Sequence, residues 1–144
     1  MISKQLYFED VNEGTELPPK SKPIESKHLV MYEAVTWDFY PGHYDRDYAK
    51  GQGGFKDIYV DGPMVIAWYG HMLTDWIGND GRIQKVIGRY KNSMYPGDTI
   101  TTHGKVVKKY TEGNRNLVEL DLQAENQNGA TTSTGKATVT LPSR

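Results

Sequence analysis

The stretch from Pro63 to Ile77 constrains the fold most, because its apolar side chains cover nearly the whole circumference of a helix. A helix of this kind must be buried on most sides. Pro63 suits the first turn of such a helix, and Gly78 suits its end. The apolar set comprises Met64, Val65, Ile66, Ala67, Trp68, Tyr69, Met72, Leu73, Trp76 and Ile77.

Four segments that follow this helix are predicted to be β-strands. They are rich in β-branched residues, partly alternate polar with apolar side chains, and are separated by turn sequences. Because the turns are short, we expect consecutive strands to pair antiparallel. A curved sheet wrapped around one buried helix is an α+β arrangement, and its long edges favour dimerisation through an edge strand. The predicted strands span residues 82–92, 99–110, 116–126 and 130–141.

A shorter helix is predicted in the first half of the chain, after an extended proline-rich connector over residues 16–27. Ser26 can cap this helix and Pro41 ends it. Asp38 lies four residues after Ala34 and continues its apolar face, so we expect Asp38 to point toward the core. Residues 45–57 are polar and rich in glycine, which predicts a loop with room for a short helical turn. The apolar face comprises Val30, Met31, Ala34, Val35 and Trp37.

Length and composition restrict the class of protein. A chain of 144 residues predicts one domain over residues 1–144, and a net charge of −1 argues against nucleic acid or an anionic membrane as a partner. The absence of cysteine excludes disulfides and thiolate metal sites. Without a signal-like N-terminus or an apolar run long enough to span a bilayer, we expect a cytoplasmic protein.

The stretch TWDFYPGHYD places an acid and an imidazole, Asp38 and His43, on either side of a Pro-Gly turn. A carboxylate and an imidazole that lie close together can share proton transfer, one accepting a proton while the other donates. The alternative is an ordinary helix end followed by a turn. On spacing alone, this second interpretation is favoured.

The stretch VDGPM marks the start of the central helix. The N-terminus of a helix presents unpaired N–H groups, so the Gly62 N–H is a candidate donor to an oxyanion. An ordinary Gly-Pro helix start is the alternative, and taken alone it is the more common case. His71 and Asp75 lie one helical turn apart, but they have no third ligand in the pattern, so we predict no metal site.

Taken in order, these motifs resemble those of the MaoC-like dehydratases, which include the (R)-specific enoyl-CoA hydratases of the hot-dog fold. The matching stretches are DFYPGH, then YVDGPM at the helix start, then YPGD between strands, with YFEDVNEGTELP near the N-terminus. The resemblance covers nearly the whole chain. It implies a hot-dog fold, in which an antiparallel sheet wraps a long helix and two copies pair into a longer sheet.

The resemblance also implies an activity, which is the reversible addition of water across the α,β double bond of an acyl thioester. Asp38 and His43 take the acid/base positions, and the Gly62 N–H takes the oxyanion position. The implied substrate carries coenzyme A, or the phosphopantetheine arm of acyl carrier protein, as its handle. No metal or redox cofactor is implied, and the expected assembly is a homodimer or higher homo-oligomer.

Three residues depart from the family pattern and are predicted to contact substrate. Tyr40 stands where the family has Asn, Asp61 where it has His, and Pro63 where it has Met. Two other functions remain open. One is a hot-dog thioesterase, in which a carboxylate and water act at the thioester carbonyl. The other is a non-catalytic subunit that binds acyl thioesters.

Overall fold

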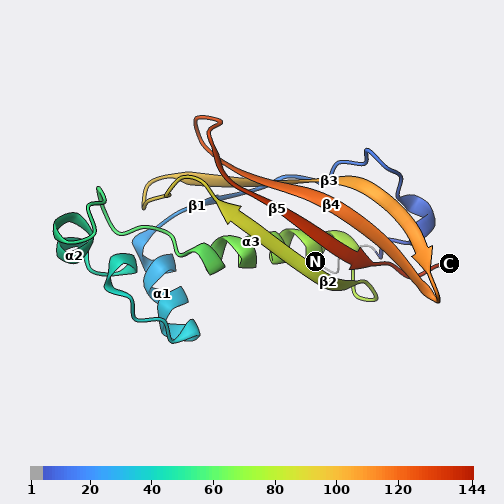
Figure 1. Cartoon of the computed structure of the whole chain (residues 1–144), viewed down its shortest axis with the longest axis horizontal. Coiled ribbons are helices and arrows are strands. Elements are labelled where there is room, and N and C mark those ends of the chain that lie inside the picture. The colour runs from blue at the N-terminus through green and yellow to red at the C-terminus, as the bar shows by residue number, and fades with distance from the viewer. Residues whose placement is uncertain (1–4) are drawn as a thin grey trace.

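A five-stranded antiparallel sheet curls around one long helix in this protein (Figure 1). The structure is a computed structural model and describes residues 5–144. The helices are α1 (Ser26–Thr36), α2 (Arg46–Gly51) and α3 (Gly62–Ile77), with short 3-10 helices at Phe8–Asp10 and Pro41–His43. The strands are β1 (Lys20–Pro23), β2 (Arg82–Tyr90), β3 (Thr99–Glu112), β4 (Arg115–Asn126) and β5 (Thr131–Thr140).

The strand order is β1-β3-β4-β5-β2. The β3–β4 and β4–β5 hairpins confirm antiparallel pairing of consecutive strands, but β2 pairs with β5 and not with β3. Residues 91–98 are long enough for this crossing, since each residue reaches about 3.3 Å and neighbouring strands are about 4.8 Å apart. The predicted connector also contains an edge strand, β1, which ends at Pro23 and pairs with β3.

Helix α3 lies along the concave side of the sheet (Figure 1). Glycines on the inner face let the sheet approach it closely. A Cβ on Gly88 would lie 2.5 Å from Ile66 Cδ1, and one on Gly104 would lie 3.3 Å from Met72 Cε. This arrangement confirms the predicted α+β hot-dog fold. The buried residues of the helix are Met64, Val65, Trp68, Tyr69, Met72, Leu73 and Ile77.

Helix α1 differs from its prediction. It begins after the N-cap residue Glu25, and it ends at Thr36 because Trp37 adopts a left-handed conformation with φ 62°. Its buried residues are Leu29 and Glu33, while the predicted apolar face points outward. Asp38 is exposed, so the prediction that it faces the core as part of this helix is wrong. The reason is that α1 lies beyond one end of the sheet, where only a narrow stripe of the helix is covered (Figure 1).

The segment predicted as a loop with a short helical turn contains α2, a helix of six residues. The Asp45 carboxylate caps this helix by accepting from the backbone N–H groups of Asp47 at 2.9 Å and Tyr48 at 3.0 Å. Together with α1 and the Pro41–His43 turn, α2 forms a helical end beside the N-terminus of α3 (Figure 1). In the described residues 5–144, no helix is long and apolar enough to cross a membrane.

Candidate active site

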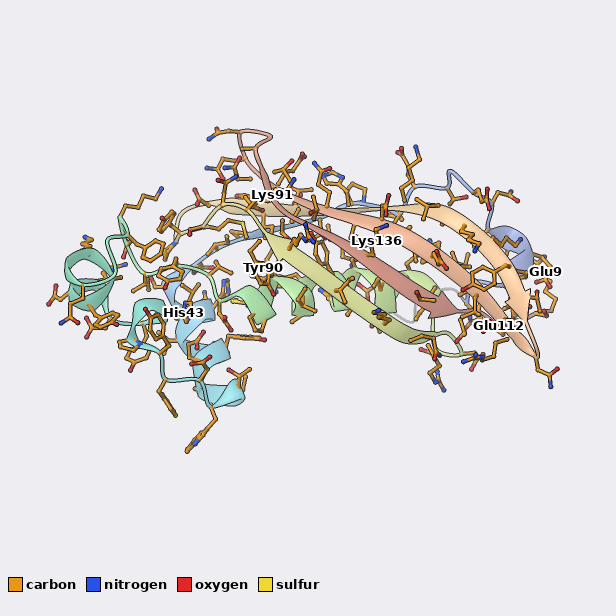
Figure 2. All side chains as sticks on the ribbon, in the orientation of Figure 1. Glu9, His43, Tyr90, Lys91, Glu112 and Lys136 are labelled. Carbon is orange, nitrogen blue, oxygen red and sulfur yellow. The ribbon has the colours of Figure 1, made fainter. Side chains whose placement is uncertain are left out.

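The predicted acid, base and oxyanion donor come from three segments that meet at the helical end of the molecule. Asp38 follows α1, His43 ends the short 3-10 helix, and Gly62 opens α3. Figure 2 shows His43 at this end, with Tyr90 and Lys91 at the near end of β2.

The turn after α1 brings Asp38 back toward the helix. The Glu33 carbonyl accepts hydrogen bonds from the Trp37 N–H and, at 3.2 Å, from the Asp38 N–H. The Asp38 carboxylate accepts from the Tyr40 N–H at 3.0 Å, which holds its orientation. A left-handed residue other than glycine costs free energy, and such residues concentrate at functional sites. Because the turn brings Asp38 back toward α1, its carboxylate lies within 4.8 Å of carboxylate oxygens of both Glu33 and Asp61, although Asp38 is exposed.

His43 is buried, and one of its ring nitrogens is fixed by the backbone. Its Nδ1 lies 2.7 Å from the Tyr59 carbonyl oxygen. Because a carbonyl oxygen can only accept, Nδ1 carries the proton and donates. In the neutral ring, Nε2 then keeps its lone pair, and it lies 3.8 Å from Asp61 Oδ1. The rings of Tyr40 and Tyr59 pack edge-on against the imidazole at centroid distances of 5.5 Å and 4.7 Å. This geometry presents a basic nitrogen toward the carboxyl groups.

Glu33 is a member of this cluster that the sequence motifs did not identify. Its side chain is only 2% exposed, and neither carboxylate oxygen has a hydrogen-bond partner among residues 5–144. Burial raises the pKa of Glu33 to about 7, with His43 opposing the shift and the Asp61 and Asp38 charges adding to it. Glu33 lies four residues after Leu29 on the buried face of α1, but the sequence held no signal for its burial, because the more apolar face of this helix is exposed.

Asp61 is also buried and is the N-cap residue of α3. Burial raises its pKa, His43 lowers it, the Asp38 charge raises it, and the Gly62 N–H lowers it. The Asp61 carboxylate therefore lies close to the same N–H group that is the predicted oxyanion donor.

Gly62 is the first residue of α3 and Pro63 the second, which has no N–H of its own. The Tyr90 ring lies against Gly62, so a Cβ at this position would be 2.5 Å from Tyr90 Cε2. Burial is the main cause that raises the pKa of Tyr90. Pro63 is exposed.

A cavity of about 230 Å³ opens between His43 and Gly62. Tyr40, Pro63 and the three carboxyl groups are not among the residues that line it. A larger hollow of about 560 Å³ lies over β2, β4 and β5 and contains none of the predicted site residues. The smaller cavity is lined by His43, Tyr59, Val60, Gly62, Val65, Tyr90, Lys91, Asn92, Ser93, Met94 and Thr132.

Two groups of residues carry atoms that can bind a metal ion. Glu33, Asp38 and Asp61 offer hard oxygen atoms within 4.8 Å of one another, a separation that a divalent cation can bridge. His71 Nε2 lies 3.3 Å from Asp75 Oδ2 on the surface, where Asp75 also pairs with Lys20. The absence of a resident metal stays a prediction.

The fold and the motifs define a MaoC-like protein. The family model described as "MaoC like domain" matches residues 10–128, and the chain belongs to this family. No curated protein sequence matches the chain well enough to count as a relative.

Solved structures share the fold over nearly the full chain. A chain of the ChsH1–ChsH2 complex from Mycobacterium tuberculosis is 27% identical with a TM-score of 0.81, covering 90% of this chain and 98% of that one. The (R)-hydratase from A. caviae involved in PHA biosynthesis is 22% identical with a TM-score of 0.80, covering 92% and 98%. A monoamine oxidase regulatory protein from Archaeoglobus is 22% identical with a TM-score of 0.85, covering 100% and 99%.

Proposed function

We propose that the protein is an acyl-thioester hydratase or dehydratase, which adds or removes water across the α,β double bond of an enoyl thioester. One observation carries the proposal. The buried imidazole of His43 and the N-terminal residue of α3, Gly62, line the same cavity, and His43 Nε2 lies 3.8 Å from the Asp61 member of the carboxyl cluster. Membership of a family that includes hydratases supports the same reaction.

The proposed reaction needs a base, an acid and an oxyanion donor. Asp38 and His43 hold a water molecule, and His43 Nε2 accepts one of its protons as the oxygen bonds to C3 of the acyl chain. The electrons of the C2–C3 double bond move toward the thioester carbonyl oxygen, where the Gly62 N–H stabilises the negative charge. The dyad then delivers the proton to C2, so that one water molecule has been added.

The proposed substrate is a short acyl chain on a coenzyme A or acyl carrier protein thioester. A cavity of about 230 Å³ is small for a ligand site, since such sites typically hold about 300–1,000 Å³. Tyr40 packs against the catalytic imidazole, and Asp61 adds a carboxyl group behind it, so both are proposed to influence acyl selection. Pro63 is proposed to act only through the geometry of the helix entry. The proposed assembly is a homodimer or a higher homo-oligomer.

The test follows two signals with one purified protein. A short 2-enoyl-CoA is added, and the loss of conjugated-enone absorbance is compared with the release of free thiol. We expect hydration without thiol release, and we expect Asp38→Asn and His43→Gln to abolish it. Thiol release without hydration would identify a thioesterase. Neither signal over a broad panel of acyl thioesters would favour a non-catalytic binding subunit.

A further inference from the structure

The carboxyl groups of Glu33, Asp38 and Asp61 surround a single point. One carboxylate oxygen from each of the three residues lies within 4.8 Å of the other two. Any three points this close lie within about 2.8 Å of one common point, which is the usual separation of two oxygens joined by a hydrogen bond. One oxygen atom at that point would contact all three carboxyl groups, and His43 Nε2 lies 3.8 Å from the Asp61 member.

Glu33 shows why this point needs an occupant. It is 2% exposed, and both carboxylate oxygens lack a hydrogen-bond partner among the described residues. Leaving a buried polar group unpaired costs about 1–3 kcal/mol, so such groups are usually satisfied by water or an ion. Asp38 is exposed and held by the Tyr40 N–H, whereas Glu33 has no anchor of its own.

Burial and the charged groups around Glu33 determine whether its carboxyl group is neutral or ionised. The groups that face it are His43, Asp61 and Asp38, and burial is the largest influence on its ionisation. Three ionised carboxylates so close together repel one another, and Glu33, the most deeply buried of them, is the one that most readily keeps its proton. A neutral carboxyl group has an O–H to donate, while Asp38 and Asp61 can accept. A water molecule there can accept one hydrogen bond from Glu33, donate one hydrogen to a carboxylate and the other to His43 Nε2, and keep one lone pair for attack.

We propose that Glu33 is a positioning residue, whose neutral carboxyl group donates a hydrogen bond to a water molecule held between Glu33, Asp38 and Asp61. This inference rests on the proposed hydratase function, in which that water is the nucleophile. In the reverse direction the same O–H donates to the 3-hydroxyl group of the substrate. Glu33 itself forms no bond to carbon and transfers no proton.

Two substitutions separate a neutral donor from an ionised carboxylate. Glu33→Gln keeps an N–H donor at the same reach, whereas Glu33→Met keeps the volume without a polar group. At pH 7 we expect Glu33→Gln to retain kcat within about threefold and Glu33→Met to lose about 10- to 100-fold, the effect of one lost hydrogen bond to a reacting group. The fall in wild-type kcat that accompanies ionisation of Glu33 above neutral pH should be missing from the Glu33→Gln profile. Thermal melts of all three proteins establish that the variants fold.

Equal kcat values for Glu33→Met and the wild type would overturn the proposal. Equal losses in Glu33→Gln and Glu33→Met would also overturn it, because an ionised carboxylate would then be required. Crystal structures of the wild type, from crystals grown with and without Mn²⁺, show what occupies the point between the three carboxyl groups and need no activity assay. An ordered water between the three carboxyl groups supports the proposal even if no thioester is hydrated. An anomalous Mn²⁺ signal there, or no bound oxygen in a well-ordered map, contradicts it.

Discussion

His43 Nδ1 lies 2.7 Å from the Tyr59 carbonyl oxygen, and this contact fixes which ring nitrogen can act as a base. The carbonyl accepts the Nδ1 proton, so Nε2 carries the free lone pair and faces Asp61. The backbone around Tyr59 thus has the orienting role that a carboxylate has in many acid/base pairs.

If the protein has the proposed function, replacing His43 should remove catalysis and leave binding. We expect His43→Gln to lower kcat of enoyl-CoA hydration by about 10²- to 10⁴-fold with little change in KM, because general base catalysis acts in the transition state. His103→Gln is the matched control, since His103 pairs with Glu125 at 3.0 Å away from the cavity. Equal losses in both variants would show that the effect on kcat is not specific to His43.

The contact between Tyr90 and Gly62 predicts a stability effect. In Gly62→Ala the new Cβ would lie 2.5 Å from the Tyr90 ring, and we expect the free energy of unfolding to fall by about 1–3 kcal/mol. Gly70→Ala, in the same helix, has open space around its Cβ and should gain about 0.5–1 kcal/mol. Urea denaturation measures both values. Adding Tyr90→Ala to Gly62→Ala should relieve the clash, and a Gly62→Ala variant as stable as the wild type would contradict this packing.

The raised pKa of Glu33 predicts how the free energy of unfolding depends on pH. Its pKa is about 7 in the folded protein and near 4.5 when exposed, so the unfolded chain loses the proton first as pH rises. Ionisation of the unfolded chain therefore lowers stability between pH 4.5 and 7, by up to about 3 kcal/mol for this one group. Below pH 4.5 the group is protonated in both states and contributes nothing.

Glu33→Gln removes this dependence. The free energy of unfolding of Glu33→Gln minus that of the wild type should therefore grow from pH 4.5 to pH 7 and then level off. Chemical denaturation at a series of pH values measures the difference. A constant difference across this range would mean that Glu33 titrates at its ordinary pKa in the folded protein. The pKa of Asp61 is also raised, so the stability curves of the wild type and of Glu33→Gln both keep the smaller pH dependence that Asp61 contributes.

Most of the fold could be predicted because the deciding signals are local. The apolar run over residues 63–77, bounded by Pro63 and Gly78, identified α3, and alternation with turn residues identified β2 to β5 within a few positions. The pairing of β2 with β5 could not be predicted this way, because it depends on where residues 91–98 cross the sheet. The edge strand β1 was missed because its proline content resembles that of a connector.

The site was predicted less completely. Order along the chain predicted His43 and Gly62 as site residues, and the structure places both on one cavity. The prediction that Asp38 points inward assumed that the helix continues through Asp38. The helix ends before Trp37, where the backbone is left-handed, so helical spacing no longer determines where Asp38 points. Glu33 was missed because an acid inside an apolar-looking helix is usually solvated, and only the tertiary position of α1 buries it.

Lys91 is the lysine among the cavity-lining residues. We therefore predict that it binds a phosphate group of the carrier. We expect Lys91→Ala to raise KM for an enoyl-CoA about 3- to 10-fold with kcat unchanged, because an exposed cation contributes about 1 kcal/mol to binding a phosphate. Lys136→Ala is the control, since Lys136 lies over the outer hollow beside Asp121. Steady-state kinetics at low salt compares them. Unchanged KM in Lys91→Ala would exclude this contact.

The position at which water enters the substrate tests the central claim most directly. The protein is incubated with a short 2-enoyl-CoA in H₂¹⁸O, and the products are read by mass spectrometry. A hydratase places ¹⁸O on C3 of an acyl chain that is still joined to coenzyme A, and Asp38→Asn should remove this product. Finding ¹⁸O in a free carboxylic acid, with coenzyme A released, would contradict the account.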